Sequence, residues 1–574
     1  MNRDLNHSFL PMNAIEMKAR GWSELDVLLI SGDAYVDHPA FAAAVIGRVL
    51  EADGLRVGIV AQPDWNDPAS LNVMGTPRLF CGITAGNLDS MLAAYTAGRR
   101  KRREDSYSEG GEAGKRPNMA TVVYSQLARR AFSGVPVVIG GIEASLRRTV
   151  HYDYWQDKLR PSVLQDSKAD ILVYGMGERA VREIARRLEG KQSLEGIPGT
   201  ARLLGGRESA ERDFEACVNL PSLEECKAEK SNLIRLAKLT EQEQNPYCGR
   251  PLVQMHGTRA LFIEPPAEPL KTAEFDRIYE LPFQHAPHPS YKQSIPAFSM
   301  IKDSVTVVRG CGGGCTFCGL GMHQGRFLSS RSELSVVHEV EGLAQQKSFR
   351  GTVSDLGGPT ANLYGCHNGV SEACRKCRKA SCLYPKVCPN LQVDKNAAIR
   401  LMRHVRKLDR VKHVFIQSGI RMELALQNPK YIRELAASHV SGHLKVAPEH
   451  LHPKVVKRMR KPGMEVFEEF RSLFERFSRD AGKKQYLVPY FISNFPGSTK
   501  EEMKVVQGYL RDERWKLQQV QDFIPLPMTP AAAMYYSGLD YESEKPIPVI
   551  RGLAERRSQI NRLKGRKAPR KRNR

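Results

Sequence analysis

Residues 304–319 read SVTVVRGCGGGCTFCG, a short apolar strand that runs into a loop of cysteines and glycines. The loop places Cys311, Cys315 and Cys318 close together along the chain. Three thiols are an odd number for disulfides, and they are one ligand short of a tetrahedral metal site. The spacing therefore predicts a metal centre whose missing ligand comes from another molecule.

Composition indicates a globular chain of several domains. The 574 residues are 41% hydrophobic and 26% charged, and eight of the twelve cysteines lie between Cys311 and Cys388. Such clustering favours metal binding over a disulfide framework. The opening residues lack an apolar segment of signal-peptide length, and no run of about eighteen apolar residues occurs. We therefore expect a cytoplasmic protein with no membrane contact.

The net charge of +23 is concentrated in two places, GRRKRRED at 98–105 and a tail with eight Lys or Arg between Asn561 and Arg574. A blocky basic tail is usually disordered and solvated. We expect residues 541–574 to be a disordered basic tail that is able to contact RNA, the ribosome or another polyanion.

Residues 1–190 predict an α/β domain with a flavodoxin-like, doubly wound parallel sheet. Continuous Val, Ile and Leu runs alternate with helical segments, which is typical of parallel strands covered on both faces. The expected strands are 25–31, 56–61, 78–84, 135–141 and 169–175. A ligand of such a sheet binds at the carboxyl ends of the strands.

Residues 191–300 are Pro-rich in places and are expected to form a connecting segment with some helix.

Residues 301–540 predict a partial (β/α)6 barrel of the TIM type with a cysteine-rich insert at 366–390. Its expected strands are 304–310, 349–358, 411–419, 442–448, 484–493 and 518–527. Each strand is followed by a phrase rich in functional residue types, where barrel enzymes place their active sites.

The cysteine loop has the chemistry of an iron–sulfur site. Glycines at 312–314 and 319 let the backbone wrap closely around a 4Fe-4S cluster held by Cys311, Cys315 and Cys318. Three protein ligands leave one iron open, as catalytic zinc sites keep one position open. The alternative is a zinc knuckle completed by a distant ligand such as His323.

The spacing C-x3-C-x2-C, with Phe317 before the last cysteine, resembles the signature of the radical S-adenosylmethionine (SAM) superfamily. The resemblance implies that the amino and carboxylate groups of SAM chelate the open iron. DLGGPTANLYG at 355–365 is similar to the phrase that binds the SAM amino group, here through Gly357 and Gly358. SGIR at 418–421 is similar to the segment that contacts the SAM ribose or carboxylate, which assigns Ser418 and Arg421 to SAM as well.

Longer phrases, among them GGIEASLRR, HYDYW, CLYPKVCPNL and QVQDFIPLPMTPAAAMYYSG, resemble the YgiQ-type radical SAM proteins over nearly the whole chain. The resemblance implies reductive cleavage of SAM to a 5′-deoxyadenosyl radical, which abstracts hydrogen from a substrate. An electron donor such as a flavodoxin or ferredoxin is then needed. The substrate is unknown, and the basic charge admits RNA modification.

A second group of cysteines follows within the insert, at Cys374, Cys377, Cys382 and Cys388. Their spacing suits an auxiliary iron–sulfur cluster or a structural zinc, and the interleaved Arg and Lys residues favour thiolate. The alternative is a reduced, cysteine-rich excursion on the barrel rim.

The segments VPVVIGGIEAS and DILVYGMGERAVREI resemble the N-terminal domain of cobalamin-binding radical SAM enzymes. A cofactor tail, with cobalamin as one option, could pack against the strand-end residues Gly140, Gly141, Gly175, Gly177 and Glu178. The same residues also suit ordinary strand–helix turns. His38 lacks the spacing of a cobalamin-ligating motif and is interpreted as a loop histidine.

A rival from another class remains open, namely a non-catalytic metal-binding, RNA-associated protein that uses both cysteine groups structurally. It predicts no cleavage of SAM and folding that depends on zinc. The phrase GGPT after the second barrel strand favours the enzyme.

Overall fold

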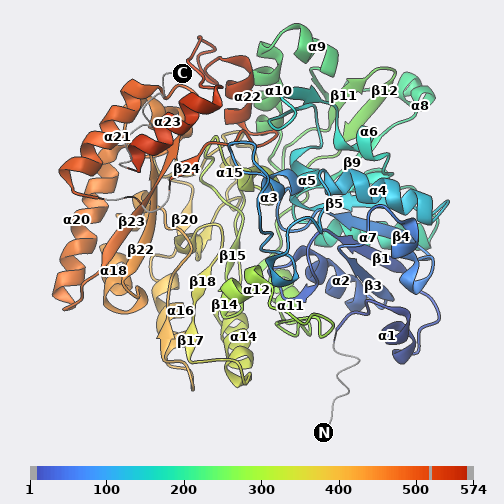
Figure 1. The fold of residues 1–574 in the computed structure, drawn as a ribbon, viewed down its shortest axis with the longest axis horizontal. Coiled ribbons are helices and arrows are strands. Elements are labelled where there is room, and N and C mark those ends of the chain that lie inside the picture. The colour runs from blue at the N-terminus through green and yellow to red at the C-terminus, as the bar shows by residue number, and fades with distance from the viewer. Residues whose placement is uncertain (1–8, 516, 518–519, 565–574) are drawn as a thin grey trace, which may run out of the picture.

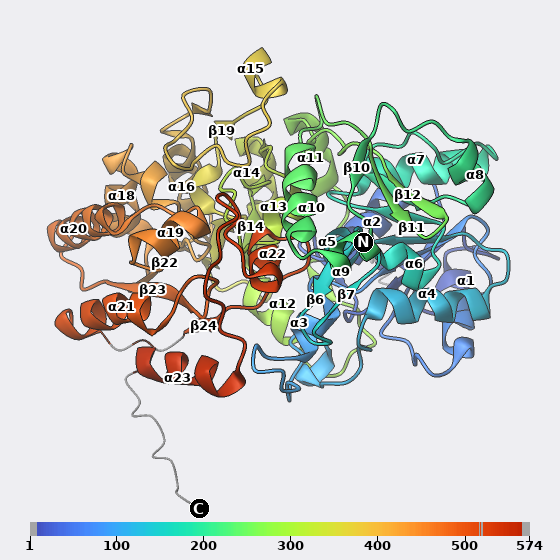
Figure 2. The ribbon, with the colours of Figure 1, turned by 90° about the horizontal axis from the view of Figure 1, so that it is seen from above.

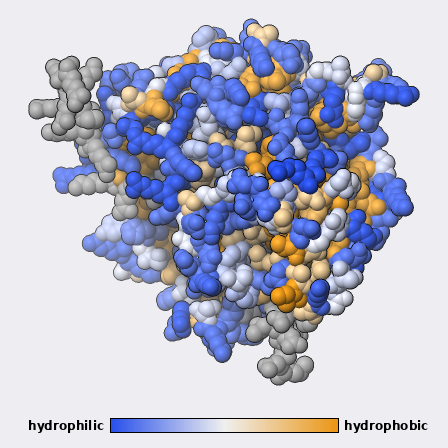
Figure 3. Space-filling model, turned by 45° about the vertical axis from the view of Figure 1, so that its right-hand side comes forward, coloured by the Kyte–Doolittle hydropathy of each residue, from blue (hydrophilic) through white to orange (hydrophobic). Residues whose placement is uncertain are grey.

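We describe the chain from a computed structural model that covers residues 9–515, 517 and 520–564. Two halves lie side by side, one coloured blue to green and the other yellow to red (Figure 1). The view from above shows the same separation (Figure 2). The face drawn in Figure 3 is largely hydrophilic, with hydrophobic residues in small groups. Over the residues covered, no helix is both long enough and apolar enough to cross a membrane.

Within the described residues, the first half is built on a nine-stranded sheet in which five parallel strands are adjacent. All five runs predicted from the sequence form these strands. In spatial order they are β3 (Val57–Ala61), β1 (Val27–Ser31), β4 (Phe80–Thr84), β5 (Val137–Gly140) and β8 (Ile171–Val173).

Helices cover both faces of the parallel strands. Val27 of β1 packs in a core with α2 (Ala42–Ala52), whereas Leu28 packs in a separate core with α4 (Ala120–Ala131). Successive side chains of a strand point to opposite faces, so a strand covered on both sides must be apolar throughout. The sequence VLLIS of β1 meets this requirement, and every residue of it is buried.

The predicted boundary at residue 190 is wrong, because the sheet continues to Ile263. Four further strands extend it beyond β8: β9 (Thr200–Leu203), β12 (Arg259–Ile263), β11 (Leu252–His256) and β10 (Val218–Leu220). β9 is antiparallel to β8, and β12 is antiparallel to both of its neighbours, so the sheet is mixed. Polar residues such as Arg202 and Asn219 interrupt these strands, and the sequence therefore lacks the continuous apolar runs that mark the parallel ones.

The second half contains short parallel strands in the places predicted for a barrel. They are β14 (Ser304–Thr306), β17 (Thr352–Val353), β18 (Asp355–Gly357), β21 (His413–Val414), β22 (His443–Glu449), β23 (Tyr486–Ser493) and β24 (Gln521–Asp522). β14 pairs with β18, β17 with β21, and β23 with both β22 and β24, all in parallel. Helices such as α20 (Met464–Asp480) pack around them, and α20 buries Phe470 and Phe474 in the core of this half.

The expectation of a disordered tail from residue 541 is wrong for the part that the structure describes. Helix α23 (Leu553–Leu563) lies against α21 (Lys500–Asp512). Its Gln559 Oε1 accepts a hydrogen bond from the Asn494 N–H at 3.0 Å, and its Arg556 is buried in an ion pair. Residues 565–574, which carry much of the basic charge, lie outside the described residues.

A buried ion pair joins the two halves. Glu178 begins helix α7 (Glu178–Glu189) of the first half, and Arg309 lies in β15 (Val308–Arg309) just before the cysteine loop. Both side chains are less than a tenth exposed. The guanidinium also lies 5.0 Å from the ring centroid of Phe275 and 5.3 Å from that of Tyr279. Because a helix N-terminus favours an anion and the rings favour a cation, each charge has support beyond its partner.

We expect Arg309→Met to lower the free energy of unfolding by about 3–5 kcal/mol, because the Glu178 carboxylate would remain buried without its partner. Urea unfolding followed by circular dichroism measures the change. Arg207→Met is the matched control, since Arg207 and its partner Glu211 are both exposed, and it should change stability little. Equal stability of the two variants would contradict the role given to the buried pair.

Candidate active site

The cysteine loop lies between β15 and the short helix α13 (Leu320–Gln324). It passes so close to other groups that a side chain would not fit at Gly313. A Cβ there would lie 2.8 Å from Nη1 of Arg421 and 3.4 Å from Sγ of Cys311. The glycines therefore let the backbone pack between a guanidinium and the thiols, as the sequence analysis expected of a cluster-binding loop.

The three thiols share one enclosed environment. Burial, together with the nearby Cys315, raises the pKa of Cys318 to about 12 and also raises the pKa of Cys311. Nη1 of Arg421 donates to Cys315 Sγ at 3.3 Å, and Lys461 opposes the rise at Cys311. Groups that perturb one another in this way lie close together, so the structure brings the three predicted ligands to one place.

The donor set fits an iron–sulfur cluster. Across the described ranges, no three Cys, His, Asp or Glu side chains stand in a group that could hold a metal ion. Thiolates around a cluster are farther apart than thiolates around a single ion, because the irons and sulfides lie between them. Three thiols on a glycine-rich loop, with a guanidinium to offset their negative charge, suit a cluster that keeps one iron open.

Gly357 and Gly358, which are predicted to bind SAM, lie at the end of strand β18. The backbone there passes very close to other groups. A Cβ at Gly357 would overlap the carboxylate of Asp355 and the hydroxyl of Ser418, and a Cβ at Gly358 would overlap the carbonyl of Val308. Asp355 Oδ1 accepts hydrogen bonds from the Ser418 N–H at 3.1 Å and from its hydroxyl at 3.0 Å. The Asp355 carboxylate thus ties the end of β18 to the loop after β21, and it brings two predicted SAM segments together.

Arg421 belongs to the same junction. Its N–H donates to Asn362 Oδ1 at 2.8 Å, and Asn362 Nδ2 donates back to the Arg421 carbonyl at 2.9 Å. Its side chain is directed to Cys315 and to Glu423, whose Oε1 accepts from Nε at 2.8 Å. The structure therefore places Arg421 beside the thiols predicted to hold a cluster, as well as near the expected SAM segment. Phe317, the residue before Cys318, packs with its ring edge-to-face to Phe495 at 6.3 Å.

Glu449 is a site residue that the sequence analysis did not name. It ends strand β22 after a shift of register, with a positive φ of 65° that is unusual for a residue other than glycine. Burial raises the pKa of its carboxyl, and the charges of Lys461 and Arg421 oppose that rise. Its Oε2 has no hydrogen-bond partner among the described residues. The only sequence signal was its position in the phrase APEH after the fourth strand.

The second cysteine group packs directly on the cysteine loop. The Cys382 N–H donates to the Gly312 carbonyl at 2.8 Å, and Ser381 Oγ donates to the Gly313 carbonyl at 2.9 Å. Within the group, Asn368 Nδ2 lies 3.4 Å from Cys382 Sγ. The insert therefore covers the loop that carries the predicted cluster ligands.

The thiols of this second group are not equivalent. Hydrogen bonds from the Lys379 N–H and from Arg326 lower the pKa of Cys377, although burial opposes this, and Arg326 Nη1 lies 3.9 Å from its Sγ. Cys388 and Cys377 both perturb Cys382, so these three lie near one another. Cys374 Sγ is instead directed to the carbonyl of Asn390 at 3.9 Å. Three of the four predicted residues are thus brought together.

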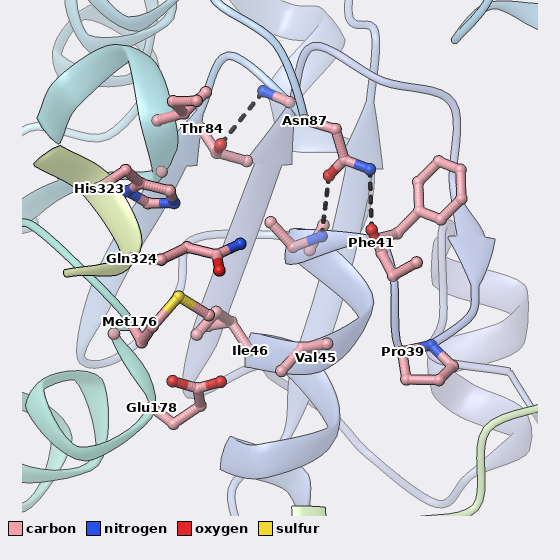
Figure 4. A pocket seen from close by; sticks show the side chains of 18 of the residues that line it. Pro39, Phe41, Val45, Ile46, Thr84, Asn87, Met176, Glu178, His323 and Gln324 are labelled. Carbon is pink, nitrogen blue, oxygen red and sulfur yellow. Dashed lines mark hydrogen bonds between the residues drawn. The ribbon is translucent and has the colours of Figure 1, made fainter. Parts of the chain in front are cut away.

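A cavity of about 550 Å³ separates the carboxyl ends of the parallel strands from the second half. Figure 4 shows α2 on one side of it and the side chains of His323 and Gln324, from α13, on the other. The strand-end residues predicted for a cofactor tail line it, as do both predicted SAM glycines: Gly140, Gly141, Gly175, Gly177, Glu178, Gly357 and Gly358. The two sets of predicted residues therefore open into one space. His38 lies in a turn before α2, where its Nδ1 accepts from the Ala40 N–H at 3.0 Å.

Residues 9–304 match the family described as Radical SAM N-terminal. UPF0313 protein RPA0679 of Rhodopseudomonas palustris is 46% identical, over 96% of this chain and 85% of its own. UPF0313 protein YgiQ of Salmonella typhimurium is 42% identical, over 96% of this chain and 84% of its own. The radical SAM methyltransferase TsrM of Kitasatospora setae, solved with cobalamin and a 4Fe-4S cluster, covers 88% of this chain and 73% of its own, with 16% identity and a TM-score of 0.48.

Relatives of this identity, matched over almost the whole length, define a class of radical SAM proteins. The chain belongs to the UPF0313 family, whose YgiQ-type members the sequence motifs resembled, and the resemblance is confirmed. At a TM-score of 0.48, the TsrM structure is too distant to transfer a ligand or a site to this chain.

We expect Gly357→Ala to abolish binding of SAM, because the new methyl group would displace the Asp355 carboxylate or the Ser418 hydroxyl. Equilibrium dialysis with labelled SAM measures the effect. Gly419→Ala, one residue after Ser418, is the control, since a Cβ at that position meets nothing within 4 Å. If both variants bind SAM as the parent does, Gly357 is not part of the SAM site.

Proposed function

We propose that this radical SAM protein holds a 4Fe-4S cluster on Cys311, Cys315 and Cys318 and binds SAM at the iron left open. The observation that carries the proposal is the convergence of the cysteine loop, Gly357 and Arg421 at one end of the second half. When bound and reduced, this pair of cofactors supplies a 5′-deoxyadenosyl radical that abstracts hydrogen from a substrate.

The chain's own residues position and enclose these groups. Arg421 places a fixed positive charge beside Cys315, which stabilises thiolate over thiol. Gly357 and Gly358 leave room for a ligand to approach the backbone. Glu449 Oε2 offers a buried acceptor with no hydrogen-bond partner among the described residues, and the positive charge of Lys461 opposes the negative charge of this carboxylate. The insert at 366–390 covers the loop and limits the access of water.

For the fold, we propose a flavodoxin-like sheet joined to a partial (β/α)6 barrel. Counted along the chain, the five parallel strands lie in the order second, first, third, fourth, fifth, which is the flavodoxin-like order. The parallel pairs of the second half follow one another in chain order, as in an open barrel.

We further propose that the large cavity takes a second organic cofactor, with cobalamin as the candidate. The support is its place at the carboxyl edge of a parallel sheet, where ligands of doubly wound folds bind, and its walls of glycine and aliphatic residues.

The proposed cytoplasmic location, with a flavodoxin or ferredoxin as electron donor, is supported by the cysteines. All twelve fall within the described ranges and are free thiols, as a reducing compartment keeps them.

Cys315→Ala is expected to remove the visible charge-transfer absorption of anaerobically reconstituted protein and to abolish 5′-deoxyadenosine formation. Cys217→Ala is the control, because Cys217 packs with Phe214 in a small core of the first half. Iron and zinc analysis of the same samples tests the second cysteine group: iron for one cluster and no zinc would argue against a second metal site. SAM cleavage retained in Cys315→Ala would overturn the cluster assignment, whereas a parent protein that cleaves no SAM would favour a non-catalytic metal-binding protein.

RNA is the proposed macromolecular partner of the basic charge. Deleting residues 565–574 is expected to weaken RNA binding and to reduce its dependence on salt, because fewer Lys and Arg would displace counterions. The deletion begins after α23, so that the contacts of Arg556 and Gln559 are kept. Filter binding at several salt concentrations measures the effect, and an unchanged salt slope would exclude this tail as the contact.

A further inference from the structure

The polar groups that line the large cavity are nearly all engaged with other parts of the chain. Asn87 Oδ1 accepts from the Ala42 N–H at 3.2 Å, and its Nδ2 donates to the Ala40 carbonyl at 2.9 Å, as the dashed lines of Figure 4 show. Gln324 Oε1 accepts from the Gly310 N–H at 3.1 Å, which leaves this amide only N–H groups to offer. Glu178 Oε1 is paired with Arg309, whereas its Oε2 has no hydrogen-bond partner among the described residues. The cavity therefore offers few free electron pairs.

His323 offers one of these free electron pairs. Its ring points into the cavity beside Gln324 (Figure 4). Its Nδ1 lies 2.9 Å from Ser145 Oγ, and that hydroxyl also accepts from the Gly175 N–H at 3.2 Å. Its Nε2 has no hydrogen-bond partner in the part of the chain that the structure describes. A ring fixed through one nitrogen, with the other nitrogen free, is the arrangement of histidines that bind a metal.

The imidazole is neutral at physiological pH. Burial lowers the pKa of His323 to about 4, and the positive charges of Arg148 and Arg309 act in the same direction, against Glu178. Above this pKa the free nitrogen keeps its lone pair, which a metal ligand requires. The tautomer in which Nδ1 donates to Ser145 Oγ leaves Nε2 unprotonated, which is the form that a metal ligand requires.

The walls decide what kind of metal centre can fit. They are mostly glycine and aliphatic or aromatic side chains, with Phe41, Val45 and Ile46 across the cavity from His323 (Figure 4). Among the described residues, no three Cys, His, Asp or Glu side chains gather there to hold a free ion. A planar macrocycle brings its own four in-plane donors and needs only one axial ligand from the protein. Its flat apolar faces also suit walls that lack free hydrogen-bonding groups.

We propose that Nε2 of His323 is the axial protein ligand to the cobalt of a corrinoid bound in this cavity. This rests on the proposed function insofar as the cavity takes a second organic cofactor, but it is independent of the iron–sulfur cluster. It places the corrinoid between the strand ends of the sheet and the SAM glycines Gly357 and Gly358, which line the same space. Ser145 then acts as a positioning residue that holds the ring.

The test is electron paramagnetic resonance of the full chain loaded with hydroxocobalamin, desalted and reduced to the Co(II) state. Coordination by imidazole splits the cobalt lines into triplets, because the nuclear spin of ¹⁴N is one. Protein labelled with ¹⁵N-histidine should give doublets instead, which separates His323 from the nucleotide base of the cofactor. His323→Ala should remove the splitting, and Ser145→Ala should weaken cobalamin binding by about tenfold. His404→Ala, at an exposed histidine, should change nothing.

Three outcomes would overturn the proposal: no retention of cobalamin, retention of haemin in its place, or splitting that neither the label nor His323→Ala alters. Met176 is another side chain near the cavity that could ligate cobalt (Figure 4). Because a sulfur ligand gives no nitrogen splitting, a spectrum that lacks this splitting and changes in Met176→Leu would likewise count against His323. Cys315→Ala should keep the nitrogen splitting while it loses SAM cleavage. A failure of the proposal for His323 can therefore be distinguished from a failure of the cluster assignment.

Discussion

The buried ion pair between Glu178 and Arg309 is the constraint on which the arrangement of the molecule depends. Glu178 sits at the first residue of α7, where the carboxyl edge of the sheet meets the cavity. Arg309 precedes Cys311, the first cysteine of the loop, by two residues. The pair therefore sets the distance between the strand ends of one half and the cysteine loop of the other, and so the width of the cavity between them. Two charges with so little exposure hold this position only while both are present.

The parallel part of the sheet could be predicted because its physical requirement is local. A strand such as β1, buried on both faces, must be a continuous apolar run, and this pattern is visible in the sequence. β10 is an edge strand and β9 lies inside the sheet, but they carry the polar residues Asn219 and Arg202, so no continuous apolar run marks them. Helix α23 was missed for a related reason. Its buried Arg556 is basic in the sequence and becomes a core residue only through Asp522, which lies far away along the chain.

The candidate site divides in the same way. The spacing of Cys311, Cys315 and Cys318, and the glycines that follow β18, are local patterns whose chemistry can be interpreted from the sequence alone. Contacts across the chain could not be foreseen. Examples are the guanidinium of Arg421 beside Cys315 and the insert residue Cys382 on the Gly312 carbonyl. Glu449 was missed because its role depends on a register shift and on burial, and neither property can be predicted from the neighbouring residues in the sequence.

The docking of α23 has a consequence for the order in which the chain folds during its synthesis. The nine-stranded sheet is complete once residue 263 has been made, and an N-terminal unit of this kind can fold early. The second half has no such opportunity. Asn494 and Asp522, at the ends of β23 and β24, bond to each other at 2.7 Å, and each takes a further partner from α23, within the last residues that the structure describes. A nascent chain therefore carries a finished sheet and an unfinished second half until α23 has been made, and during that interval the strands of the second half are the part most exposed to misfolding.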